Sequence, residues 1–223
     1  MPTLLHISAS PRGDASESLA LAEAFMAELN RLRPDIDQRT WDLWDGSLPD
    51  FGPAAAAAKM AVFAGASPQG EQASAWRLAT ETFQRFADAD YYLFSVPMWN
   101  AGVPYVLKQL IDVISQPGYF FSFDPEVGYT GLLTGRKAVT IYTSAIYGQG
   151  RPPEFGADFQ APFLQEWLRW SGIEEAGTVT FRPNLVTSDV DQQRGRAIAE
   201  ALRVAEEIAR GHAAAVLPEF LTP

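Results

Sequence analysis

The sequence contains no cysteine among its 223 residues. This absence excludes a disulfide framework, a thiolate metal site and a cysteine nucleophile, and it fits a reducing compartment, so the cytoplasm is the expected location. Only two histidines are present, and His6 falls inside an expected strand, where a core role is the simplest interpretation. No carboxylate pair has the spacing of a metal site or an acid–base pair, so no metal is expected. Glu174 and Glu175 are expected on the solvated surface.

Positive charge and long apolar runs are also scarce. Lysine and arginine number 17 against 27 aspartates and glutamates, which gives a formal net charge of -10. Such a surface repels phosphate groups, so nucleic acid is not expected as a partner. No stretch stays apolar for about 18 residues, and the N-terminus lacks a basic segment followed by an apolar one. Neither a membrane span nor a signal peptide is expected.

A hydrophobic content of 47% is enough for one substantial core, so residues 1–223 are expected to form a single domain. Short apolar runs alternate with segments of helical periodicity, which predicts an α/β fold whose parallel sheet is covered by helices on both faces. We expect strands at residues 3–8, 37–41, 91–97, 137–143 and 178–181, with a small extended piece at 119–123. We expect helices at residues 18–33, 76–87, 104–115, 159–171 and 191–209, and a short helix within an excursion over residues 44–74.

Three loops follow the first, third and fourth expected strands. Their sequences are SASPRGDASES, PMWNAG and TSAIYGQG. Ligands of open parallel sheets bind at the carboxyl ends of the strands, so these loops form the candidate site. The first loop lacks the spacing of a P-loop, and no G-x-G-x-x-G motif is present, which disfavours nucleoside triphosphates and Rossmann-type dinucleotides.

The first loop is rich in hydroxyl groups. Ser10, Ser16 and Ser18 can donate hydrogen bonds to phosphate oxygens, and the amides at the start of the following helix add donors and a favourable dipole. Helix capping by Ser16 is an equally good interpretation of this loop taken alone.

Sequence segments spread along nearly the whole chain accompany this loop. SES at residues 16–18 and DLWDGSLPDF after the second strand are followed by FSVPMWNAGVPYVLKQLIDVISQPGYFFSF and TGRKAVTIYTS. The most specific feature is PMWN before a helix that contains LKQLID. With these segments the chain resembles the flavodoxin-like, FMN-dependent NADH:quinone oxidoreductases known as azoreductases.

The resemblance implies a flavodoxin-like three-layer sandwich with strand order 2-1-3-4-5 and a bound FMN. It implies that the first loop holds the FMN phosphate through Ser10, Ser16, Glu17 and Ser18.

The same resemblance implies that the second loop runs along the flavin ring. The positions that match are Met98, Trp99, Asn100 and Ala101. A flavin ring needs apolar surfaces on its faces and amide groups at its polar edge, and Trp99 and Asn100 supply both. A half-buried core role for Trp99, a turn role for Asn100 and gap filling by Met98 are the alternatives.

The third loop departs from the family pattern. The family shows a serine followed by Arg-Gly-Gly, whereas this chain continues from Ser144 into Ala145, Ile146 and Tyr147. These residues remain the candidates for flavin contacts from this loop.

The distribution of aromatic residues suggests the position of an acceptor pocket. Aromatic residues cluster at positions 119–123 and recur at 159, 163, 167 and 170. Core packing is the simplest interpretation for Phe163 and Trp170. The resemblance implies a homodimer with flavin sites at the interface, where Phe120 or Phe121 from one subunit meets Trp167 from its partner. Tyr119 is a further candidate for this pocket. The alternative for Trp167 is a core position.

The implied function is two-electron transfer by a ping-pong mechanism from NADH or NADPH to small quinones or azo compounds. FMN carries this chemistry, so no catalytic acid or base is expected in the chain. A flavodoxin-type FMN electron carrier and a flavin-free scaffold are the alternatives. The long excursion over residues 44–74 disfavours the carrier.

Overall fold

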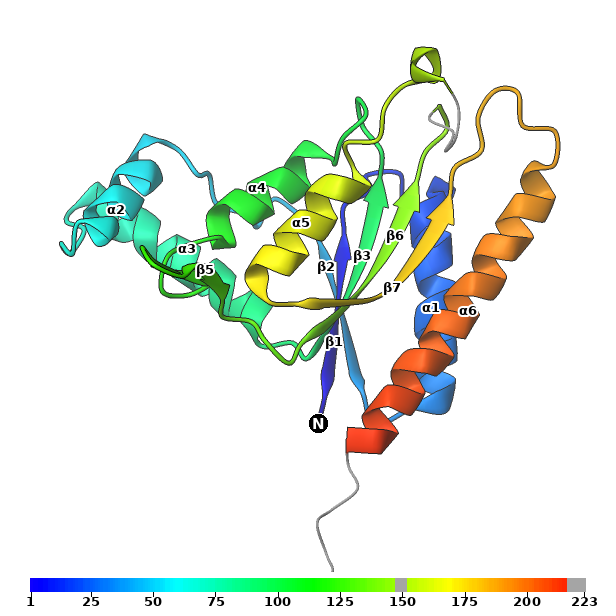
Figure 1. The fold of residues 1–223 in the computed structure, drawn as a ribbon, viewed down its shortest axis with the longest axis horizontal. Helices are drawn as coiled ribbons and strands as arrows, with labels where there is room; N and C mark the ends of the chain where they lie inside the picture. The colour runs from blue at the N-terminus through cyan, green and yellow to red at the C-terminus, as the bar shows by residue number, and fades with distance from the viewer. Residues whose placement is uncertain (147–151, 216–223) are drawn as a thin grey trace, which may run out of the picture.

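The computed structural model describes residues 1–146 and 152–215. Five parallel strands form one sheet in the order β2-β1-β3-β6-β7 (Figure 1). The strands are β1 (Thr3–Ser8), β2 (Asp37–Asp42), β3 (Tyr91–Pro97), β6 (Lys137–Thr143) and β7 (Glu174–Phe181). This is the predicted order 2-1-3-4-5, because β4 and β5 form a separate pair. Ser8 of β1 lies opposite both Asp42 and Ser95, so neighbouring strands end at one edge of the sheet.

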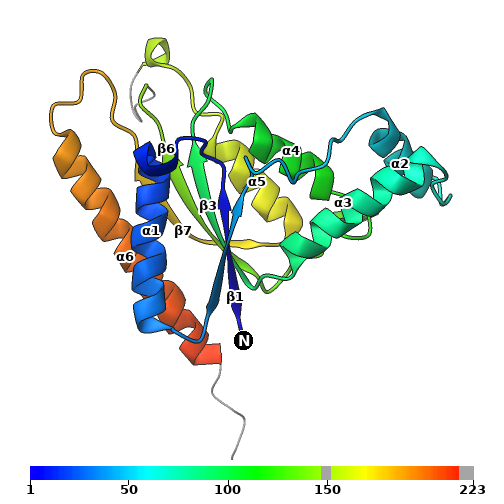
Figure 2. The same cartoon turned by 180° about the vertical axis from the view of Figure 1, so that it is seen from behind.

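Helices lie on both faces of this sheet. Figures 1 and 2 show α1 and α6 side by side on one face and α3, α4 and α5 on the other. Each set packs on its own apolar cluster, one centred on Phe25 and Val204 and the other on Phe94, Leu107 and Leu168. The helices are α1 (Glu17–Leu32), α2 (Pro53–Phe63), α3 (Glu71–Ala87), α4 (Tyr105–Ile114), α5 (Ala161–Ser171) and α6 (Val190–Ala215).

The excursion after β2 contains more helix than predicted. The alanine run forms α2 as expected, with Pro53 in its first turn. The next helix, α3, begins at Glu71 rather than at residue 76, because Gly70 adopts a φ of +57° that ends the preceding loop. Both helices extend beyond the sheet in Figure 1.

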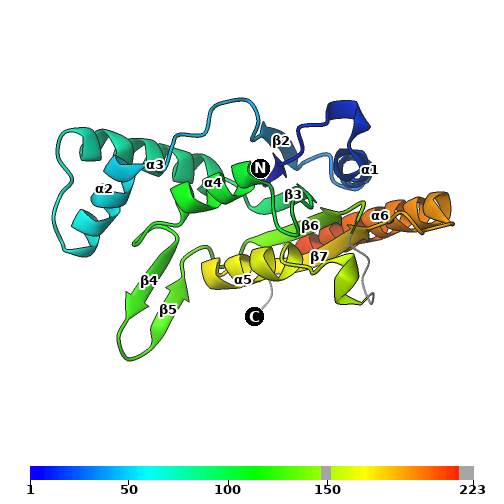
Figure 3. The same ribbon diagram turned by 90° about the horizontal axis from the view of Figure 1, so that it is seen from above.

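A two-stranded hairpin of β4 (Phe121–Asp124) and β5 (Gly128–Gly131) stands apart from the sheet (Figure 3). The sequence predicted only its first strand. Gly131 is where the hairpin meets the end of α5, since a Cβ there would lie 2.3 Å from the Gly172 nitrogen. Only glycine permits this close backbone approach.

The last strand begins at Glu174, earlier than the predicted residue 178. The expectation of a purely solvated Glu174–Glu175 pair was wrong for Glu175, whose carboxylate accepts hydrogen bonds from Thr140 at 2.6 Å and Thr178 at 3.1 Å. A register irregularity between Ala138 and Val139 accompanies this pairing.

His6 is a buried core residue, as its place in the strand suggested. Its Nε2 lies 2.8 Å from the Ser95 hydroxyl, which donates in turn to the Ser18 carbonyl at 3.2 Å. Nδ1 lies 3.4 Å from the Thr40 hydroxyl. Burial lowers the pKa of His6 from 6.5 to about 4, so the imidazole is neutral at neutral pH.

We expect this histidine to make folding stability sensitive to moderately acid pH. The unfolded chain binds a proton near pH 6.5 and the folded chain only near pH 4, so the contribution is complete above pH 6.5 and is lost as the pH falls toward 4. Urea unfolding should show a loss of about 2 to 3 kcal/mol between neutral pH and about pH 4.5 that His6→Gln lacks. Parallel pH profiles for the two proteins would contradict this assignment.

Candidate functional site

Three loops meet at the carboxyl edge of the sheet, which is uppermost in Figure 1. They follow β1, β3 and β6, which are consecutive in the sheet. The chain adds β2 on one side of β1 and β3 on the other, so the first two loops flank the point where strand order reverses. Open α/β sheets bind ligands at this point.

The first loop forms a serine cradle, which we define as Ser10, Ser16 and Ser18. The three residues are 4%, 5% and 1% exposed. Ser16 caps α1 by accepting a hydrogen bond from the Leu19 amide at 3.4 Å, so the capping interpretation is realised. The Ser16 and Ser18 hydroxyls lie 3.1 Å apart. One of the two hydroxyl protons is used in the hydrogen bond between these serines, and the other can be donated to a ligand. Helix capping by Ser16 and ligand binding are therefore compatible.

Glu17 follows the cap directly, and its side chain is paired within the chain. Its carboxylate is held by Arg194 of α6 through two hydrogen bonds, of 2.7 Å and 3.0 Å. The hydrogen bond to Glu17 raises the pKa of Arg194 above its usual value. The carboxylate is therefore committed to an ion pair within the chain.

The second loop makes a tight turn at Trp99–Gly102. The amides and carbonyls of these two residues exchange hydrogen bonds of 2.9 Å, and Asn100 and Ala101 between them have φ values of +47° and +67°. Asparagine tolerates a positive φ, but for an alanine such as Ala101 this conformation costs about 1 kcal/mol or more of folding stability. Such local strain is typical of functional loops.

Trp99 lies at the surface of this turn and is 37% exposed. Its ring centroid is 5.5 Å from that of Trp44 and 6.2 Å from that of Tyr105. Trp44 in turn donates to the Ala9 carbonyl at 3.1 Å, which connects the turn to the serine loop. Trp99 thus presents an accessible aromatic surface near the start of the serine loop.

The rest of the turn is anchored by its backbone. Met98 is half-buried, and its amide donates to the Thr143 carbonyl at 2.7 Å. The Phe159 amide donates to the Ala101 carbonyl at 2.9 Å, so the segment before α5 holds the turn from the other side. The Asn100 side chain is exposed and available to a ligand.

The third loop is described as far as Ile146. The Ser144 amide donates to the Phe181 carbonyl at 3.2 Å, and the Ser144 hydroxyl accepts from the Ile146 amide at 3.3 Å. Ala145 and Ile146 are exposed. Tyr147, also a sequence candidate, lies outside the described residues.

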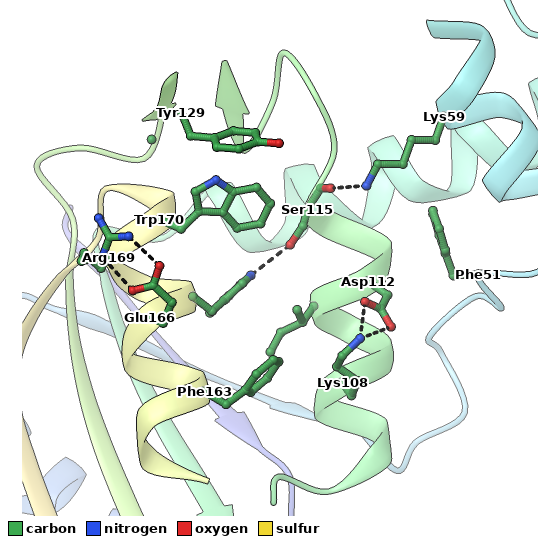
Figure 4. Close-up of a pocket in the computed structure, with 13 residues that line it drawn as sticks. Phe51, Lys59, Lys108, Asp112, Ser115, Tyr129, Phe163, Glu166, Arg169 and Trp170 are labelled. Atoms are coloured by element: carbon green, nitrogen blue, oxygen red, sulfur yellow. Dashed lines mark hydrogen bonds and ion pairs between the residues drawn. The ribbon is translucent and has the colours of Figure 1, made fainter. Parts of the chain in front are cut away.

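Two cavities occupy the groove between α4 and α5. One of about 810 Å³ begins at the Trp99 turn, and one of about 790 Å³ reaches the β4–β5 hairpin. Lys108 and Phe163 line both, so the cavities adjoin. Figure 4 shows the second cavity, with Phe163 and Trp170 on one side and the α4 residues on the other.

The charges in the second cavity are largely paired (Figure 4). Lys108 binds Asp112 at 2.6 Å, and Arg169 binds Glu166 at 2.5 Å. Lys59 of α2 donates to the Ser115 carbonyl at 3.0 Å, and burial lowers the pKa of its ammonium group. The cavity is therefore an aromatic slot with a polar rim.

The predicted acceptor residues are mostly core residues of this chain. Trp167 is 4% exposed, stacks on Phe120 with centroids 5.0 Å apart, and donates to the Ser115 hydroxyl at 2.9 Å. Phe121 is buried, and Tyr119 packs on Phe83 at 5.5 Å. Trp167 nevertheless contributes to the lining of the second cavity.

Phe163 and Trp170, for which the sequence favoured the core, are half-buried and line the same cavity more openly. Sequence reasoning also missed Phe51, Lys59 and Tyr129, which come from the excursion and the hairpin. The aromatic spacing of α5 identified its apolar face but not which part of that face is open.

Among the described residues, no cluster of three or more histidine, aspartate or glutamate side chains could hold a metal ion. The helices within residues 1–146 and 152–215 include none that combines the length and apolarity needed to cross a bilayer.

Comparison with known proteins relates this site to a family. The family model described as "Flavodoxin-like fold" matches residues 2–206. An FMN-dependent NADH:quinone oxidoreductase of Ruegeria pomeroyi is 41% identical over 199 residues, which cover 89% of this chain and 98% of the relative. The chain belongs to the flavodoxin-like family of FMN-dependent NADH:quinone oxidoreductases.

Solved structures of azoreductases share this fold. The azoreductase of Bacillus anthracis strain Sterne superposes with a TM-score of 0.84 at 24% identity, covering 93% of this chain and all (100%) of that one. An FMN-dependent NADH-azoreductase of Bacillus anthracis strain Ames Ancestor, solved with FMN, gives 0.82 at 22% identity, covering 94% of this chain and 100% of that one. This chain therefore shares its overall fold with these two solved structures.

The strained turn gives a direct test of the backbone geometry. Ala101→Gly should raise the free energy of unfolding by about 0.5 to 1 kcal/mol, because glycine adopts positive φ without the Cβ clash. The same substitution at Ala57, exposed in the interior of α2, should lower it by about 1 kcal/mol. Denaturant unfolding of the two variants measures the difference, and destabilisation by both would show that Ala101 is unstrained.

Proposed function

We propose that this protein is an FMN-dependent oxidoreductase that passes electron pairs from NADH or NADPH to quinones and azo compounds. One observation carries the proposal: the loop from β1 to the first turn of α1, with its three buried serines, lies near the strained Trp99 turn at the point where strand order reverses. The names of the family relatives support the same activity.

The donor set of this edge fits FMN. The serine hydroxyls and the first-turn amides of α1, which have no partner within the helix, suit a terminal phosphate. Trp99 offers an apolar surface and Asn100 an amide for the flat ring and its polar edge. Residues 144–146 and Tyr147 complete the proposed contacts. When bound, FMN supplies the two-electron chemistry, so the chain itself needs to bind, orient and shield rather than transfer protons.

The groove between α4 and α5 suits a flat acceptor. It starts at the Trp99 turn, and the two adjoining cavities are lined by aromatic rings from α5, the hairpin and the excursion. A nicotinamide and an acceptor that use one exposed flavin face in turn give a ping-pong mechanism. The slot supports flat quinones and azo dyes as acceptors.

We further propose a homodimer with its flavin sites at the interface. Tyr105 and Phe159 are exposed beside the Trp99 turn, and a second subunit would cover them. In that arrangement Trp167, Phe120 and Phe121 support the pocket from beneath, and Tyr119 supports its far end. The helix sets of Figure 1 support the three-layer description, and the absence of cysteine supports a cytoplasmic location.

The carrier alternative is less well supported. An electron carrier needs an exposed flavin edge and little else, whereas here Phe51 of the excursion, Tyr129 of the hairpin and the aromatic residues of α5 line a groove. The two functions differ in whether NADH reduces the flavin directly.

Replacing Ser16 and Ser18 together by alanine tests the cradle. The double variant should bind FMN at least tenfold more weakly, because hydrogen bonds to a charged phosphate are worth about 1.5 to 3 kcal/mol each. Riboflavin, which lacks the phosphate, should bind the two proteins equally, and FAD should bind no better than FMN. Flavin fluorescence titration of the apoproteins measures all three, and unchanged FMN affinity in a folded variant would return these serines to capping.

Phe163→Ala and Trp167→Ala separate the acceptor slot from the core. Phe163→Ala should raise the KM for a bulky quinone severalfold while FMN content and flavin reduction by NADH stay unchanged. The reason is that the ring binds the acceptor equally in the ground state and in the transition state. Trp167→Ala should instead lower the free energy of unfolding by about 3 to 5 kcal/mol. Steady-state kinetics and thermal unfolding of both variants provide the test. A stable Trp167→Ala protein with a raised KM would place Trp167 in the slot rather than the core.

A further inference from the structure

The proposed phosphate site has a carboxylate next to it in the sequence. Glu17 is the first residue of α1 and lies between the cradle residues Ser16 and Ser18. The phosphate of FMN carries nearly two negative charges at neutral pH, and like charges at close range repel. An unpaired Glu17 would therefore oppose the ligand that its neighbours are arranged to bind.

Arg194, which is distant in the sequence, pairs its positive charge with this carboxylate. Its Nη2 and Nε bind the two oxygens of Glu17 at 2.7 Å and 3.0 Å, across 177 residues of sequence. The two-bond geometry fixes the direction of the carboxylate as well as its charge.

The guanidinium is itself held in place. Its Nη1 lies 2.6 Å from Asp191 on the same helix, and its central carbon lies 5.4 Å from the centroid of the buried Phe181 ring. The Phe181 carbonyl also accepts a hydrogen bond from the Ser144 amide. Arg194 therefore packs on the same strand that anchors the third loop. These contacts keep the positive charge beside the start of α1.

We propose that Arg194 is a positioning residue for the cofactor: it holds the Glu17 carboxylate in an ion pair and so allows the serine cradle to accept the FMN phosphate. This inference rests on the proposed function. The two side chains are 36% and 37% exposed, and exposed ion pairs contribute little to folding stability. The pair is therefore not needed for folding, and the proposed effect is on phosphate affinity.

The test compares FMN with riboflavin, which differ only in the phosphate. Arg194→Gln should weaken FMN binding to the apoprotein by roughly tenfold and leave riboflavin binding within about twofold, because only FMN meets the released carboxylate. Arg194→Lys keeps the charge and should retain most of the affinity. Fluorescence titration gives the dissociation constants, and thermal unfolding of the apoproteins confirms that the variants fold.

The double variant Glu17→Gln, Arg194→Gln gives the decisive comparison. Removing the carboxylate removes the need for Arg194, so FMN affinity should return at least to that of the wild type. Arg203→Gln is the matched control, since Arg203 pairs with Glu200 and Glu207 on the same helix, about 14 Å further along it at 1.5 Å per residue. This control makes the same change in net charge and should leave both flavins unaffected.

Three outcomes overturn the inference while the proposed function stands. They are unchanged FMN affinity in Arg194→Gln, an equal loss for FMN and riboflavin, and no recovery in the double variant. Failure of the proposed function appears earlier, in the wild type: an apoprotein that binds riboflavin as tightly as FMN, or binds neither, has no phosphate site and overturns both.

Discussion

Parallel pairing of β1 with β2 and β3 is the constraint on which the rest of this structure depends. Because β1 pairs on both sides in one direction, Ser8, Asp42 and Ser95 come to the same edge of the sheet. The serine loop and the Trp99 turn then emerge side by side at the point where strand order reverses. The α1 helix starts from this edge with its free amides, and the groove between α4 and α5 opens from it.

Long-range polar contacts turn this edge into a defined site. The Trp44 indole connects the turn region to the serine loop, the Phe159 amide holds Ala101, and Arg194 fixes Glu17. Each contact joins segments far apart in the sequence, so the site exists only in the assembled fold. The strain at Ala101 is sustained by this surrounding structure, as expected for a loop that meets a ligand.

Much of the fold could be predicted from sequence, because apolar runs and helical periodicity report burial directly. The strands at 3–8, 91–97 and 137–143 match their predicted bounds, and the sheet order is the one that the family resemblance implied. The hairpin was only half predicted, since Gly128–Gly131 lacks an alternating apolar pattern and depends on close packing of Gly131 against α5. The predicted last strand began at residue 178 rather than at Glu174, because Glu174 and Glu175 are charged. The hydrogen bond from Thr140 to Glu175 has no signal in the sequence.

The candidate site was predicted less completely, for a related reason. The sequence identified the serine loop and the PMWN turn. How openly Phe163, Trp167 and Trp170 line the cavity depends on which part of the α5 face meets α4. The pairing of Glu17 with Arg194 has no local signal at all.

The central claim is that this protein is an enzyme whose bound FMN accepts electrons directly from a nicotinamide. Anaerobic stopped-flow mixing of the FMN-loaded protein with NADH or NADPH tests it most directly. The account predicts that the visible flavin absorbance bleaches without any other protein and returns when a quinone is added. A flavin whose absorbance neither nucleotide changes would contradict the account and identify an electron carrier.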